Sequence, residues 1–173
     1  MSVEELYDRC TDFCAGDCLL LSGIVYTARD AAHKRITEQI EKGLSMPFSF
    51  EKTAIYYAGP TATPPGRVIG SCGPTTSERM DGFTPLFMEK GLKIMIGKGK
   101  RSPGVEASIQ KHKGIYLCAL GGAGALAAKC IKKAEVIAFE ELGCESVKRL
   151  LFEDFPLIVG TDCQGGSLFG SDL

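Results

Sequence analysis

The chain has 173 residues, most simply a single domain over 1–173, and a chain of this length can bury about 70% of its unfolded surface. Its 20 basic and 21 acidic side chains nearly cancel without any block of like charge, which argues against nucleic acid or an anionic membrane as a partner. The acidic start lacks the basic region of a secretory signal, and no apolar run approaches the roughly 18 residues that span a bilayer, so we expect a cytoplasmic protein.

Short apolar runs alternate with helix-like patterns along the chain. In order, the sequence predicts a strand over 18–26, a helix over 29–42, a strand over 54–58, a helix from 76 or 77 to about 90, a strand over 92–96, a helix over 102–112, a strand over 115–120, a helix over 123–131, a strand over 134–139, a helix over 146–152 and a strand over 155–159. The segment 59–66 is too rich in Pro and Gly for regular structure, and the tail 162–173 reads as a hairpin or a partly ordered end. Strands separated by helices favour an α/β fold with an at least partly parallel sheet.

The eight cysteines leave two interpretations open. Cys10, Cys14 and Cys18 are spaced four apart, so on one helix they would share a face and could hold a metal. Gly16 and Asp17 look like a break, after which the three thiols would point in different directions and act as small apolar residues. With only two histidines in the chain, a histidine-rich metal site has little support, and we assign no metal ligand.

Cations and hydroxyls follow three of the predicted strands. Arg29 follows the first strand, Lys98 follows the strand over 92–96, and the remaining groups lie in the run Thr75-Thr76-Ser77-Glu78-Arg79. Ligands of open α/β proteins gather outside the carboxyl ends of strands, so we expect these side chains to meet. Two guanidinium groups, an ammonium group and three hydroxyls would suit a small molecule with more than one carboxylate.

Each of these residues also has an interpretation that needs no ligand. Arg29 could pair with Asp30 and Arg79 with Asp81, and Thr76 or Ser77 could cap a helix. A cation at a helix start is locally unfavourable, however, because the helix dipole is positive there. Two arginines in this position therefore favour an anionic ligand over a purely structural role.

With these residues in view, the chain resembles the beta subunit, or C-terminal domain, of class I iron–sulfur-dependent fumarate hydratase, and equally the beta subunit of L-tartrate dehydratase. The matching stretches run through most of the chain in order: Leu21-Ser22-Gly23, Thr27-Ala28-Arg29-Asp30-Ala31-Ala32-His33, Gly59-Pro60, Gly73-Pro74-Thr75-Thr76-Ser77 with Arg79-Met80-Asp81, Lys98-Gly99, Gly121-Gly122 and Glu153-Asp154-Phe155-Pro156.

The resemblance implies a swivelling β/β/α domain with a mixed sheet. It also implies a hetero-oligomer in which an alpha subunit, and not this chain, holds a [4Fe–4S] cluster. The assembly would hydrate fumarate reversibly to (S)-malate, and this chain would supply groups that bind the dicarboxylate. By motif position these groups are Arg29, Thr75, Thr76, Ser77, Arg79 and Lys98, with Thr75 and Lys98 also in catalytic roles.

One residue departs from the expected pattern. Position 78 is Glu where a small residue is expected, and we predict that its carboxylate points outward, as an acid in the first turn of a helix. Two rival functions remain besides L-tartrate dehydration. One is a non-catalytic domain that binds a small anion, and the other is a thiol or metal module built on Cys10, Cys14 and Cys18.

Overall fold

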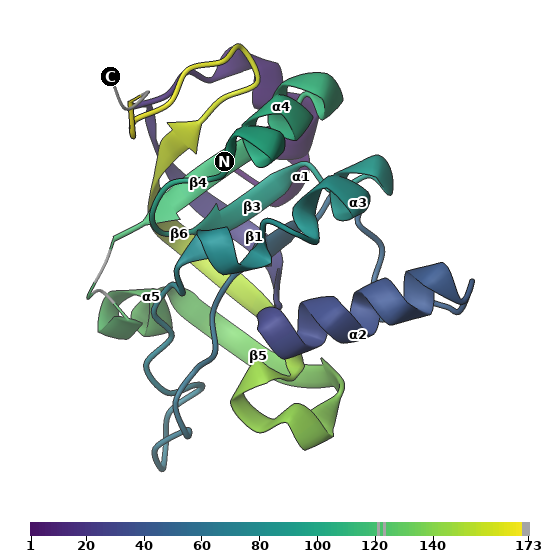
Figure 1. Ribbon diagram of the computed structural model, residues 1–173. Helices are drawn as coiled ribbons and strands as arrows, with labels where there is room; N and C mark the ends of the chain where they lie inside the picture. The colour runs from purple at the N-terminus through teal and green to yellow at the C-terminus, as the bar shows by residue number, and fades with distance from the viewer. Residues whose placement is uncertain (121, 123, 171–173) are drawn as a thin grey trace.

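The computed structural model describes residues 1–120, 122 and 124–170 (Figure 1). Its α-helices are α1 (Val3–Asp8), α2 (Asp30–Glu41), α3 (Thr84–Glu89), α4 (Pro103–His112) and α5 (Gly124–Cys130), and its 3₁₀ helices are η1 (Cys10–Asp12), η2 (Ser77–Met80) and η3 (Glu140–Glu145). Its strands are β1 (Cys18–Thr27), β2 (Ala54–Tyr56), β3 (Ile94–Gly97), β4 (Ile115–Ala119), β5 (Ile131–Ala138) and β6 (Val147–Thr161). The α/β class is confirmed, and the sheet is mixed.

The sheet closes on itself. Strands β1, β2, β3 and β4 pair in parallel in that order, and the long β6 runs antiparallel between β4 and β1, with β5 paired to β6 outside this ring. Thr27 is opposite Tyr56, and Tyr56 is opposite Ile96, so the carboxyl ends of β1, β2 and β3 lie side by side. The register thus brings segments that are far apart in the sequence to one edge.

Successive residues of the parallel strands enter two different cores. Ala54 and Tyr56 belong to a cluster to which every strand of the ring contributes. Ile55 and Tyr57 instead pack with side chains of α2, α3 and α4, which lie on one side of the sheet (Figure 1). Burial on both faces explains why these strands are nearly continuous apolar runs rather than alternating patterns.

The helix predicted over 146–152 is wrong, because this segment is the first half of β6. Val147 and Leu150 are buried three residues apart, as on one face of a helix, yet the backbone pairs with β1 on one side and β5 on the other. Asp154, with φ of 50°, interrupts the strand near a register shift against β1, and so disturbs the alternation that would identify a strand. Tertiary pairing therefore overrides the local pattern here.

The single helix predicted from 76 or 77 to about 90 is also wrong, because the structure divides it into η2 and α3. Thr76 precedes η2 without a capping hydrogen bond from its side chain, and Ser77 lies inside η2. Pro85 stands in the first turn of α3, where its missing N–H costs nothing; in the interior of a single helix from 76 to 90 it could not donate to the Asp81 carbonyl, and its ring would clash with that group. The break between the two helices follows from this proline.

The remaining predicted elements agree with the structure to within a few residues, whereas α1, η1 and η3 were not predicted. In the tail, Thr161 bridges to Ser167 and the Asp162 carboxylate accepts the Gly166 N–H, which confirms a turn there. Gly121 of the Gly121-Gly122 stretch, Ala123 of the helix predicted over 123–131, and the last three residues of the tail lie outside the described residues. Within the described part of the chain, no helix has the length and apolar character needed to cross a membrane.

His33 of α2 lies in the core beneath the site edge. Its ring is fully buried and stacks on Phe87 with the centroids 5.0 Å apart, and its Nδ1 donates a 3.0 Å hydrogen bond to the Arg29 carbonyl. The Nε2 atom has no partner among the described residues. Burial therefore lowers the pKa of His33 to about 4.

This buried histidine predicts a pH-dependent stability. Between pH 6.5 and about 4 the unfolded chain binds a proton at His33 that the folded chain does not, so the free energy of unfolding falls as the pH falls. The loss should reach roughly 3 kcal/mol across the window. The free energy of unfolding in urea would be measured across this pH range. For His33→Asn, which can keep the hydrogen bond but does not titrate, it should not show this fall. For His112→Asn it should follow the wild type. If the free energy of unfolding falls equally with pH in the wild type and in His33→Asn, His33 is not the group responsible.

Candidate functional site

The six predicted residues lie along the edge formed by the carboxyl ends of β1, β2 and β3. Arg29 comes two residues after β1, and Lys98 follows β3 directly. The segment 74–77 fits between them like a short strand, because Thr75 N–H donates to the Tyr57 carbonyl at 2.6 Å and Ser77 N–H donates to the Lys98 carbonyl at 2.9 Å. The gathering of these residues, which the sequence only suggests, is present in the structure.

The two arginines meet at one carboxylate. Arg79 forms a bidentate ion pair with Asp30, from Nε to Oδ1 at 2.9 Å and from Nη2 to Oδ2 at 2.8 Å. Arg29 Nη2 lies 3.9 Å from Asp30 Oδ2 and 3.2 Å from Glu145 Oε1. The Arg79–Asp81 pair considered from the sequence does not form, because Asp81 pairs with Arg101.

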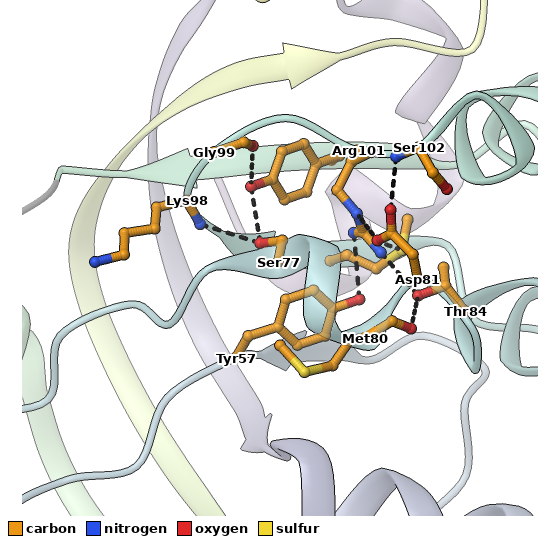
Figure 2. A network of polar contacts seen from close by, with 11 residues as sticks. Tyr57, Ser77, Met80, Asp81, Thr84, Lys98, Gly99, Arg101 and Ser102 are labelled. Carbon is orange, nitrogen blue, oxygen red and sulfur yellow. Dashed lines mark hydrogen bonds and ion pairs between the residues drawn. The ribbon is translucent and has the colours of Figure 1, made fainter.

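Arg101, which the sequence did not single out, lies at the centre of a buried polar network next to the site (Figure 2). Its side chain is buried, and the guanidinium donates to Asp81 at 2.7 Å and to Thr84 Oγ1 at 2.8 Å. It also lies over the rings of Tyr57 and Tyr116, 5.2 and 5.0 Å from their centroids. Burial opposes its charge, but Tyr57 and Asp81 outweigh that effect and raise the pKa of Arg101.

This buried pair joins two chain segments. Asp81 ends the segment that carries the hydroxyls and Arg79, while Arg101 and Ser102 follow Lys98. The second oxygen of Asp81 accepts the Ser102 N–H at 2.6 Å, so one carboxylate binds both a side chain and the backbone of the other segment. The positions of Arg79 and Lys98 relative to each other therefore depend on Asp81.

Ser77 belongs to the same buried hydrogen-bond network. It is fully buried, its Oγ accepts the Lys98 N–H at 3.1 Å, and it shares a 2.9 Å hydrogen bond with the Tyr116 hydroxyl, which donates to the Gly99 carbonyl at 2.9 Å. A Cβ at position 97 would collide with Ser77 Oγ, so only glycine fits there. Ser77 is thus held in the network rather than at the surface.

The other predicted groups reach the surface to different degrees. Thr75 is half-buried, whereas Thr76, Arg79 and Lys98 are exposed. Figure 2 shows the Lys98 side chain pointing away from the buried network. Glu78 is exposed, in agreement with the expected outward orientation. The surface of the site therefore presents Arg79 and Lys98 together with the Glu78 carboxylate and the hydroxyls of Thr75 and Thr76.

Two residues near Arg29 were not found by sequence reasoning as part of the site. Glu145 comes from η3, more than a hundred residues away, and no local pattern indicates its contact. Gly59 lies against Arg29, because a Cβ there would stand only 2.7 Å from Nη1. The Gly59-Pro60 pair did figure among the stretches of the resemblance, although its role as a contact of Arg29 required the fold.

A neighbouring cavity is distinct from this edge. Its volume is about 460 Å³, and its lining includes Thr61, Cys144 and Lys148 but none of the six predicted residues. Burial lowers the pKa of Lys148, whose ammonium is surrounded by the carbonyls of η3. The chemistry expected from the sequence therefore lies on the strand edge and not in this cavity.

The cysteines do not form a common ligand set. Cys10 is buried, while Cys14 and Cys18 are exposed. Among the described residues, no group of three or more His, Cys, Asp or Glu side chains is arranged to hold a metal ion. Within this part of the chain, the side chains therefore offer no ligand set for an iron–sulfur cluster.

The buried ion pair predicts a large difference between two arginines. Arg101→Met should lower the free energy of unfolding by about 3–5 kcal/mol, because Asp81 would remain buried without its cation. Arg149→Met is the matched control, since Arg149 pairs with Glu135 on an exposed surface at 3.3 Å and should change stability by less than about 1 kcal/mol. Urea denaturation measures both, and equal effects of the two changes would contradict the scaffold role of Arg101.

Comparison with known proteins identifies the family of the chain. Residues 1–171 match the family model described as Fumarase C-terminus. The chain is 38% identical over 173 residues to fumarate hydratase 2 of Leishmania major, and 38% identical over 169 residues to the anaerobic class I fumarate hydratase of Escherichia coli; it covers 30% and 31% of these relatives. It is 35% identical to the L(+)-tartrate dehydratase subunit beta of Escherichia coli, of which it covers 81%. The chain thus spans about a third of the fumarate hydratases it matches, and it belongs to the fumarase C-terminus family of hydro-lyases.

Proposed function

We propose that this chain is the beta part of an iron–sulfur hydro-lyase that hydrates fumarate reversibly to (S)-malate. One observation carries the proposal: Arg29 and Arg79 meet at Asp30 on the same strand edge that presents Thr75, Thr76 and Lys98. A dicarboxylate needs fixed cations at both ends, and guanidinium groups bind carboxylates through paired hydrogen bonds.

Each residue has a distinct part in the proposal. Arg29, Arg79 and Lys98 bind the carboxylates, with Thr76 as a further donor and Ser77 fixing the backbone at Lys98. Thr75 removes the proton from malate in the dehydration direction. Lys98 stabilises the negative charge that develops on the substrate during that step, as fixed cations do in other active sites.

The charge balance of the edge supports a site that another chain completes. The three cations Arg29, Arg79 and Lys98 are offset by the carboxylates of Asp30 and Glu145 and by the exposed Glu78 next to Arg79, so the edge carries no net positive charge. A dianion would not be neutralised by this chain alone. In the proposed hetero-oligomer, which we assign to the cytoplasm, an alpha subunit supplies the remaining groups.

The cofactor of the proposed enzyme is a [4Fe–4S] cluster held by the alpha subunit. When bound, it supplies a Lewis acid at the substrate hydroxyl and carboxylate. The scattered cysteines of this chain are consistent with that division of labour. Here the role of this chain is to bind the dicarboxylate, orient it and move a proton at Thr75.

L-tartrate is the second candidate substrate, because the chain covers 82% and 81% of two L(+)-tartrate dehydratase beta subunits. Fumarate is preferred since the fumarate hydratases of Leishmania major are 38% and 41% identical, against 36% and 35% for the tartrate enzymes. The two substrates share the dicarboxylate that the edge would bind. Rates of the assembled enzyme with each substrate separate the two.

Arg79→Ala should lower kcat/KM roughly 100-fold or more, because a bidentate, charge-assisted contact with the substrate is lost. The chain would be co-produced with an alpha-type partner without oxygen, and fumarate hydration would be followed spectroscopically. Arg67→Ala, on the exposed Pro-rich loop, is the matched control and should keep full activity. An active complex that tolerates Arg79→Ala would defeat the site assignment.

Calorimetry on the isolated chain tests the rival, non-catalytic function. The proposed lyase predicts weak malate binding, because part of the site belongs to the partner. Binding as tight as that of a dedicated small-anion receptor would instead favour a stand-alone binding domain. The lyase proposal further requires that the isolated chain is inactive and that its complex with the alpha-type partner is active, whereas a stand-alone binding domain would be inactive in both.

A further inference from the structure

Glu145 makes two contacts at the junction of β1 and α2. Its Oε2 accepts the Ala31 N–H at 3.0 Å, which satisfies one of the free donors at the start of α2. Its Oε1 forms the 3.2 Å ion pair with Arg29 Nη2. Arg29 itself makes no capping hydrogen bond at the start of α2, so Glu145, which lies 114 positions after Ala31, provides the cap.

The segment that carries Glu145 is itself held firmly. The Lys148 ammonium donates to the carbonyls of Gly143 at 3.0 Å and Cys144 at 3.3 Å, and to Ser146 Oγ at 2.6 Å. Arg35 of α2 also pairs with Glu141 at 3.2 Å, but both side chains are about half exposed, so this pair contributes little to holding η3. Glu145 is thus presented to Arg29 from a braced position.

The Arg29 guanidinium is closely packed and partly exposed. Glu145 and Asp30 both approach Nη2. The Nη1 atom packs against Gly59, where any side chain would collide with it, and Nε is buried without a partner among the described residues. Glu145 therefore fixes the plane of a guanidinium of which about 20% of the side chain still reaches the surface.

We infer that Glu145 is a positioning residue, which holds the Arg29 guanidinium in the orientation that receives a substrate carboxylate. The inference rests on the proposed function, because the carboxylate that Arg29 would receive is that of the dicarboxylate substrate. Without Glu145, the arginine would turn toward solvent and toward Asp30, and part of the binding free energy would be used to restore its orientation. The main effect should therefore fall on KM rather than on kcat.

Glu145→Gln separates the two contacts of this side chain. Its amide oxygen can still accept the Ala31 N–H, but its NH₂ group faces Arg29 and cannot attract it. We expect the thermal midpoint of Glu145→Gln to stay close to that of the wild type, whereas Glu145→Ala should unfold at a lower temperature. Glu141→Gln is the matched control, because it removes an exposed acid from the same segment.

The first measurement uses the isolated full chain and does not depend on activity. Phenylglyoxal modifies arginines, and peptide mass spectrometry would give the rate at Arg29 relative to the exposed Arg67. We expect the relative rate at Arg29 to rise at least threefold in Glu145→Gln and to stay unchanged in Glu141→Gln. An unchanged rate at Arg29 in Glu145→Gln would overturn the inference.

The second measurement uses the complex with the alpha-type partner. Glu145→Gln should raise KM for fumarate or malate about tenfold or more with a smaller change in kcat, and Glu141→Gln should change neither. An unchanged or lower KM in Glu145→Gln would overturn the inference, since Glu145 would then be neutral or a competitor of the substrate. A wild-type complex without activity on either substrate would refute the proposed function alone, because the reactivity of Arg29 is measured separately.

Discussion

The Arg101–Asp81 pair is the interaction on which the site edge depends. A buried ion pair is stable only when the hydrogen-bonding capacity of both groups is largely satisfied. Here Arg101 donates to Asp81 and Thr84 between two tyrosine rings, and Asp81 also accepts the Ser102 N–H (Figure 2). The pair joins the segment that ends at Asp81 to the turn after β3, and so sets how the exposed cations stand relative to each other.

The exposed cations are held by carboxylates of the same chain. Asp30 binds both Arg29 and Arg79, and Glu145 binds Arg29 at the same Nη2 atom that Asp30 approaches. Such pairs keep long side chains in one geometry, which lowers the entropy that a ligand must remove on binding. They also neutralise most of the local charge, and this is the physical reason why the proposed site needs a second polypeptide to accept a dianion.

The closed sheet explains how residues from distant parts of the chain reach one edge. Parallel pairing aligns the ends of β1, β2 and β3, and β6 seals the ring by pairing with both β4 and β1. η3 comes directly before β6, so the same strand that closes the sheet brings Glu145 to the start of α2. Strand β6 therefore both closes the sheet and places Glu145, directly before it in the chain, in contact with Arg29.

Local chemistry in the sequence was enough to predict the α/β class, most strands, helix α4 and the set of cations and hydroxyls at strand ends. Apolar runs mark buried strands, and a proline after serine marks a helix start, because both depend on neighbouring residues only. The strand at 147–152, the closure of the sheet, and the contacts of Glu145 and Arg101 could not be predicted in this way. Each depends on partners that are distant in the sequence, so only the packed chain decides which carboxylate an arginine meets and which hydroxyl, such as that of Ser77, is buried.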